Sequence, residues 1–164
     1  MIQSPRSFDS YTQALLLSIE EEHMGETYFA TLAKFHTGSA KQALLAMSQI
    51  EAVVILAMQP LLDHLGLAVA DQKTVRALGV AEAERLQGQS WQEFLIHMNR
   101  DYPAFLEEFD QILALSPASD LKYIQVLSSH ERAFIDFGRA EQRGDTNSHR
   151  HLNDFLAEVT AFCG

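Results

Sequence analysis

Cysteine is nearly absent from this chain, whose single thiol, Cys163, lies next to the C-terminus. One thiol cannot form an internal disulfide framework, so the composition indicates a reducing compartment. The first ten residues, MIQSPRSFDS, lack the apolar core and the small-residue cleavage site of a secretory signal. Uninterrupted apolar runs of the ~18 residues that a membrane span needs are also missing. We therefore expect a cytoplasmic protein with no membrane partner.

Basic residues are also scarce, with 12 lysines and arginines against 22 aspartates and glutamates and a formal net charge of −10. Phosphate backbones require clustered positive charge, so this balance argues against nucleic acid as a partner. The chain has 164 residues and 47% hydrophobic content, which suits one compact domain with a substantial core. We expect a single domain over residues 1–164.

Strand patterns are missing as well, because no alternation of apolar and polar residues between turn glycines occurs. Helical periodicity and capping residues instead predict an all-α chain. The expected helices are Tyr11–Phe35, Ser39 or Ala40 to Gln59, Ser90–Leu115, Leu121–Gly144 and Leu152–Phe162. Residues 66–90 are too many for a tight turn, and they predict a crossover with a short helix over Thr74–Gln87. The predicted fold is an antiparallel four-helix bundle with this long crossover between its second and third helices and a short C-terminal helix covering one end.

Two helical stripes compete for the buried face of the third expected helix. One is apolar apart from a tyrosyl hydroxyl, whereas the other contains Asp101 and Glu108. We expect the apolar stripe to be buried, because a buried carboxylate without a partner is costly. Pro103 lacks a backbone donor and predicts a bend near Asn99 or Arg100, unless Asp101 caps a new start there.

Carboxylates interrupt the apolar stripes of three expected helices. Glu22 and Glu26 lie among the apolar residues of the first helix at helical spacing, and Glu51 interrupts the second helix in the same way. In the fourth helix, His130 and Glu131 flank the apolar midline from either side. A buried carboxylate persists only if it is protonated, paired or bound to a cation. Their coincidence across three helices makes these residues candidate ligands of a metal ion.

Three segments carry a likeness to a known family: IEEEHMGETYF at 19–29, IEAVVILAMQPLLDHLGL at 50–67 and SSHERAFIDFGRAEQRG at 128–144. With four long helices and a crossover, the chain resembles the ferritin-like superfamily. The resemblance implies two iron or manganese ions, held by two helix pairs that each give a lone glutamate and a Glu-x-x-His motif. It implies oxidase, peroxide-scavenging or iron-handling chemistry, with Glu51 and Glu131 as bridging ligands and Glu22 and Glu26 as terminal ligands.

Both histidines of the family motif are replaced in this chain. Val54 stands three residues after the second-helix glutamate, and Phe134 stands three residues after the fourth-helix glutamate. Neither side chain binds a metal, so the resemblance implies a degenerate site. His23 and His130 are the nearest substitutes, and the site would bind iron, manganese or zinc.

An interpretation without a metal stays open beside this one. In it, some of the glutamates face solvent or a partner, and the rest are neutralised by His23, His130 or an arginine such as Arg132. The chain would then be a non-enzymatic bundle that binds a partner or a small ligand. We expect a homodimer that buries the apolar surface of the third or the C-terminal helix, while a cavity between the helices could take a small cationic molecule.

Overall fold

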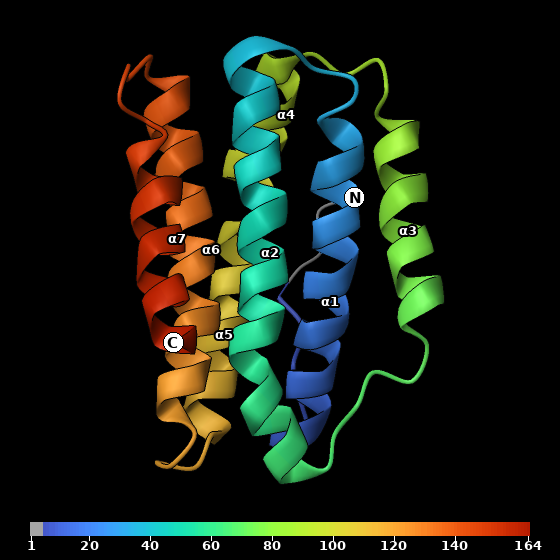
Figure 1. Ribbon diagram of the computed structural model, residues 1–164, viewed down its shortest axis with the longest axis vertical. Coiled ribbons are helices and arrows are strands. Elements are labelled where there is room, and N and C mark those ends of the chain that lie inside the picture. Colours follow the sequence, from blue (N-terminus) through green and yellow to red (C-terminus); the bar gives the residue numbers. More distant parts are fainter. Residues whose placement is uncertain (1–4) are drawn as a thin grey trace.

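The computed structural model describes residues 5–164, and every regular element in that range is an α-helix. The prediction of an all-α chain is confirmed. The helices are α1 (Tyr11–Leu32), α2 (Gly38–Leu65), α3 (Gln72–Arg85), α4 (Trp91–Asp101), α5 (Pro103–Leu115), α6 (Leu121–Gln142) and α7 (Arg150–Cys163). Most of their axes run roughly along the long axis of the molecule (Figure 1).

Polar caps fix where the first long helix and α4 begin. The Ser10 hydroxyl accepts a hydrogen bond from the Gln13 amide at the start of α1. At α4, the Ser90 hydroxyl accepts from the Glu93 amide, and the Ser90 amide donates to the Glu93 carboxylate. This reciprocal pair is a capping box, which satisfies two backbone donors that the helix leaves free. Both starts follow from the sequence.

Proline acts differently at its two helical positions. Pro60 lies inside α2, which continues to Leu65 instead of ending at Gln59 as expected. The proline is exposed, so water can satisfy the carbonyl group that lost its donor. Pro103 separates α4 from α5 at Tyr102, whose backbone stays in the right-handed helical region. The third expected helix is therefore two consecutive helices, broken slightly later than the predicted bend.

The crossover carries α3 along the outer side of α1 (Figure 1). Gly79 of α3 lies so close to α1 that an added Cβ would collide with the Met24 carbonyl oxygen and the Thr27 hydroxyl. The same hydroxyl donates a hydrogen bond of 2.8 Å to the Arg76 carbonyl oxygen of α3. The crossover thus holds a tightly packed helix, which begins and ends slightly earlier than the one expected over Thr74–Gln87.

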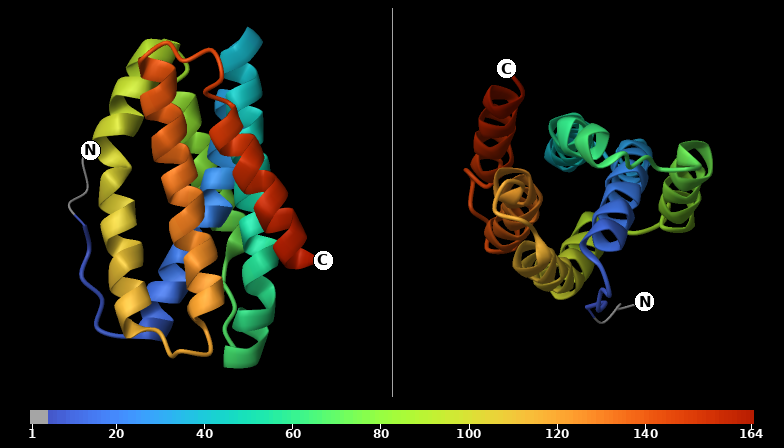
Figure 2. Two further views of the ribbon diagram at one scale, coloured as in Figure 1. Left: turned by 90° about the vertical axis from the view of Figure 1, so that its left-hand side faces the viewer. Right: turned by 90° about the horizontal axis from the view of Figure 1, so that it is seen from below.

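The position of α7 differs from the prediction. We expected this helix to cover one end of the other helices, but it lies along the sides of α2 and α6 (Figure 2). It begins soon after α6 ends and runs back along it, so its apolar face meets the side of the neighbouring helices. Leu152, Phe155 and Val159 are buried there.

The interior lies between α1, α2, α6 and the α4–α5 pair. α1 packs on α2, α2 packs on α6, and α6 packs on α4 and α5, whereas α5 touches α1 only sparsely. Seen from below, α1, α2, α6 and α5 surround this interior, and the N-terminal segment passes outside the space between α1 and α5 (Figure 2). The side chains that point inward from these helices make up the apolar core.

Among the described residues, α2 is the one helix long and apolar enough to cross a membrane by length and composition. Its most apolar window has a mean hydropathy of 1.6, and half of that window is buried inside the protein. A core helix has the same character, so this feature is weak evidence for a span.

Candidate metal centre

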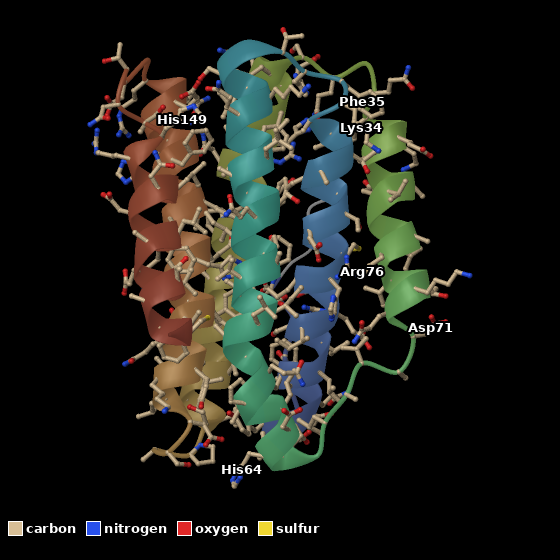
Figure 3. The ribbon with its side chains drawn as sticks, viewed as in Figure 1. Lys34, Phe35, His64, Asp71, Arg76 and His149 are labelled. Atoms are coloured by element: carbon tan, nitrogen blue, oxygen red, sulfur yellow. The ribbon has the colours of Figure 1, made fainter. Side chains whose placement is uncertain are left out.

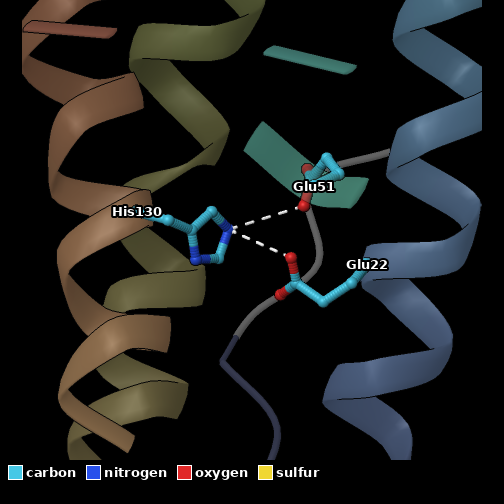
Figure 4. Close-up of side chains that lie close together, drawn as sticks. All are labelled: Glu22, Glu51 and His130. Carbon is cyan, nitrogen blue, oxygen red and sulfur yellow. Dashed lines mark ion pairs between the residues drawn. The ribbon is translucent and has the colours of Figure 1, made fainter. Parts of the chain in front are cut away.

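Four polar side chains from three helices meet in the interior, each exposed by 5% or less. Glu22 comes from α1, Glu51 from α2, and His130 and Glu131 from α6. His130 Nε2 lies 3.4 Å from Glu22 Oε2 and 3.8 Å from Glu51 Oε2. Its distance from Glu131 Oε2 is 3.7 Å. Figure 4 shows the imidazole directed towards the Glu22 and Glu51 carboxylates, and we call the four residues the carboxylate cluster.

Gly25 makes room for one of these carboxylates on the facing surface of α1. A Cβ added at position 25 would lie 2.6 Å from Glu51 Oε1, closer than real Cβ atoms approach another atom. Glycine inside a helix costs about 1 kcal/mol relative to alanine, so this residue lowers the stability of α1 by itself. Gly25 therefore lowers the stability of the helix, but its missing side chain leaves the space that the Glu51 side chain occupies.

Aromatic rings enclose the imidazole on its other sides. The His130 ring centroid lies 5.3 Å from that of Phe134, 5.7 Å from Phe109 and 6.4 Å from Phe155. Val54 and Phe134, which stand three residues after Glu51 and Glu131, are both buried at 1% exposure or less. Hydrocarbon therefore fills these two positions, and it lowers the local dielectric around the cluster.

The cluster contains more polar atoms than it can pair. Glu22 Oε2, Glu51 Oε2, Glu131 Oε1 and His130 Nδ1 are buried and have no hydrogen-bond partner among the described residues. Burial, followed by the charge of Glu22, raises the pKa of Glu51 well above its ordinary value. The same two causes raise the pKa of Glu131. Three negative charges are therefore unstable here without added protons or a cation.

The spacing of the donor atoms suits a single metal ion. One ligand atom from each of Glu22, Glu51 and His130 lies within 4.8 Å of the others. In a tetrahedral site with bonds of about 2.1 Å, neighbouring ligand atoms are about 3.4 Å apart. The distances of 3.4 Å, 3.8 Å and 3.7 Å from the imidazole nitrogen to the three carboxylates are at or slightly above that value. Glu131 lies outside this group of three, so its carboxylate would have to move closer to share the same ion.

Two predicted ligands face a different neighbour. Glu26 forms an ion pair of 2.7 Å with Arg76 of α3, and His23 Nδ1 lies 3.3 Å from the same guanidinium group. Arg76 is on the side of α3 that faces α1 (Figure 3). These contacts hold α3 against α1, and the group of potential ligands does not include either residue. Arg132, considered as a neutralising partner, is exposed on α6.

Sequence reasoning placed Glu108 off the buried face, but this residue is 4% exposed. Arg6, in the segment before α1, pairs with the carboxylate at 2.6 Å and also with Glu21 of α1 at 2.6 Å. The stripe of the third expected helix that contained two acids was the available signal for Glu108. Nothing in the sequence indicated that Arg6 would pair with buried acids, because its segment has no helical periodicity.

No cluster residue lines either of two shallow surface pockets on the described chain. One lies between α6 and α7, and the other lies between the end of α2 and the start of α6. Phe155 lines the first pocket and separates it from His130. The carboxylates are thus packed inside the protein and do not border these pockets.

No protein-family model matches this chain, and no curated protein or solved structure gives a significant match. The ferritin-like resemblance therefore stays a prediction that rests on the residues themselves.

Proposed function

We propose that this chain is a ferritin-like metalloprotein that binds a divalent cation in the carboxylate cluster. In this proposal α1, α2, the α4–α5 pair and α6 correspond to the four antiparallel helices of the family, and α3 lies in the crossover. The order of contacts around the interior supports this correspondence. So does the origin of the buried acids, since Glu22, Glu51, Glu108 and Glu131 come from α1, α2, α5 and α6.

The observation that carries the proposal is the set of unpaired, buried carboxylate oxygens in the carboxylate cluster. A buried polar atom without a partner costs about 1–3 kcal/mol, and more when it is charged. The cluster contains three carboxylate oxygens of this kind. A cation between Glu22, Glu51 and Glu131 would satisfy them together and would neutralise much of their charge.

The donor set favours iron(II) or manganese(II), and it also suits zinc. Carboxylate oxygens combined with one imidazole nitrogen suit these ions, whereas magnesium and calcium prefer oxygen ligands alone. We propose one ion instead of the two that are typical of the family. Val54 and Phe134 stand where the family has histidines, so two imidazole ligands are absent. Bound iron or manganese would supply redox or Lewis-acid chemistry, consistent with an oxidoreductase or iron-handling role.

Elemental analysis of the purified protein tests this proposal. Apoprotein prepared with a chelator is dialysed against manganese(II) or iron(II) under anaerobic conditions, and we expect one bound ion per chain. Glu51→Gln and Glu131→Gln should lose it. Glu107→Gln, which changes an exposed glutamate of α5, is the matched control and should keep it. Protein that binds no ion, and whose melting temperature is unchanged by chelators or by added metal, would refute the proposal.

A second candidate is a non-enzymatic bundle that self-associates. Large apolar side chains are exposed on the helices expected to form a dimer interface, namely Ile96 at 51%, Leu115 at 45% and Phe162 at 39%. Single exposed apolar residues are common, so the homodimer stays a prediction. Light scattering coupled to gel filtration tests it: a dimer that becomes monomeric in Ile96→Glu or Phe162→Glu would support self-association through these helices.

A further inference from the structure

Arg6 joins α1 to α5 from outside the helices. Its backbone amide donates to Glu108 Oε1 over 2.7 Å, and its guanidinium binds both carboxylate oxygens of Glu108. The same guanidinium pairs with Glu21 of α1 at 2.6 Å. The Arg6 carbonyl oxygen accepts a hydrogen bond from the Gln111 side chain of α5. One residue of an extended segment thus holds two acids from two helices.

These contacts lie at a sparsely packed part of the boundary around the interior. α1 and α5 touch only sparsely, and the N-terminal segment passes outside the space between them (Figure 2). Side-chain exposure falls inward, from 32% at Arg6 to 25% at Glu21 and 5% at Glu108. Glu22, which follows Glu21 in α1, is at 3% and has an unpaired oxygen in the cluster. Side-chain exposure thus decreases from Arg6, through the two acids that it binds, to Glu22 of the candidate metal centre.

The outer acids are also electrostatically linked to the inner ones. Glu21 lies close enough to Glu108 and Glu22 for their charges to act on it, and Arg6 acts on it in the opposite sense. The charge of Glu21 also acts on Glu51 and Glu131. A cation that approaches this position would therefore be attracted by the carboxylates of Glu21 and Glu108, while Arg6 repels it.

We propose that Glu21 and Glu108 form the entry path for divalent cations between α1 and α5, and that Arg6 is a displaceable plug in this path. An arriving ion competes with the guanidinium for the two carboxylates and then passes to Glu22 and the rest of the cluster. This inference rests on the proposed function, because it describes how the same site is filled. It predicts that Arg6 limits the rate of exchange more than the final affinity.

Stopped-flow absorbance with cobalt(II) tests the plug, since a cobalt ion that enters a carboxylate and imidazole site changes its visible spectrum. Arg6→Gln removes the charge and keeps a side chain of similar reach. Arg76→Gln is the matched control, because Arg76, whose side chain is 37% exposed, pairs with Glu26 on the side of α1 that faces α3. Circular dichroism and thermal melting confirm that each variant is folded.

We expect Arg6→Gln to bind cobalt(II) about tenfold faster than the wild type at low ionic strength, with a smaller gain in high salt. Chelator extraction should accelerate by a similar factor, so the dissociation constant should change little. Arg76→Gln should match the wild type. Should Arg6→Gln fail to fold, Arg6→Lys keeps the charge but loses the paired geometry, and it should show a smaller acceleration in both directions.

The outcomes separate this inference from the proposed function. If the wild type binds cobalt(II) as fast as Arg6→Gln, or as fast as Arg6→Lys where Arg6→Gln does not fold, the proposed role of Arg6 is wrong. The proposed metal centre is not affected by that result. Binding by Arg6→Gln alone would overturn a plug that cations displace in the wild type. Absence of binding in every protein would overturn both proposals.

Discussion

His130 Nε2 of α6 and Glu22 Oε2 of α1 lie 3.4 Å apart, and each side chain is only 3% exposed. This separation exceeds the usual 2.7–3.2 Å of a good hydrogen bond, yet it equals the spacing of about 3.4 Å between ligands of one tetrahedral ion. The separation therefore fits the cation that we propose for this site. The four predictions that follow depend on this neighbourhood and on the helices that position it.

Replacing the imidazole should weaken metal binding strongly. His130 supplies the one nitrogen donor of the cluster and faces all three carboxylates. We expect His130→Gln to raise the dissociation constant for manganese(II) or zinc(II) by at least about 100-fold. Isothermal titration calorimetry on chelator-treated protein measures this change. His97→Gln, at an exposed position of α4, is the control, and equal weakening by both variants would contradict the assignment.

The metal-free protein should lose stability as pH rises. The pKa values of Glu51 and Glu131 are raised above 4.5, so the folded state binds more protons than the unfolded chain. Stability from such groups is complete below the unfolded pKa and falls as pH rises through the folded pKa. We expect the urea midpoint of the apoprotein to decrease from about pH 5 to about pH 8, and added metal to reduce the decrease.

The comparison with Glu51→Gln isolates this effect from the rest of the protein. The pKa of His23 and of His36 is lowered by burial, which acts in the opposite sense and destabilises the folded state as pH falls. The variant keeps both histidines but loses one protonated carboxyl. Its urea midpoint should therefore vary less steeply above pH 5 than that of the wild type, and identical slopes would count against a protonated Glu51.

Adding a methyl group beside the cluster should disturb it. In Gly25→Ala the new Cβ would meet the Glu51 carboxylate, which must move away. We expect the clash to outweigh the gain in helix propensity, with a net loss of about 1–3 kcal/mol and weaker metal binding. Gly88→Ala is the control, because a Cβ there meets nothing within 4 Å. Urea unfolding and metal titration of both variants check the prediction.

The packing of α3 should fail when its closest contact is blocked. Gly79→Ala would place a Cβ against the Met24 carbonyl oxygen, which is backbone and cannot rotate away. We expect α3 to separate from α1 and to gain amide exchange over residues 72–85, with a loss of at least about 2 kcal/mol in global stability. Hydrogen exchange followed by mass spectrometry localises the change. Unaltered exchange in this segment would show that the contact adapts.

Burial of Glu22, Glu51 and Glu131 could be predicted from the sequence because a helix must bury whatever shares a face with its apolar residues. The same rule located His130 at the edge of that face. Capping residues fixed the beginnings of helices in the same local way, as the Ser90 box demonstrates. All of these inferences need only the geometry of one helix.

The remaining features depend on which helix lies opposite, and periodicity does not contain that information. Glu26 shares the stripe of Glu22, but α3 docks at that level and offers Arg76. Glu108 is buried because Arg6 pairs with it across about a hundred intervening residues. Position along one helix therefore predicted burial better than it predicted partners.

The interior acids also affect how the protein behaves in an electric field. The formal charge of −10 counts every aspartate and glutamate as ionised. Buried carboxyls such as Glu51 and Glu131 retain protons when the chain is folded without metal, so the native form should focus at a less acidic isoelectric point than the denatured chain. Uptake of one divalent ion would expel those two protons and leave the net charge of the folded chain unchanged, so proton release would report what the core contains.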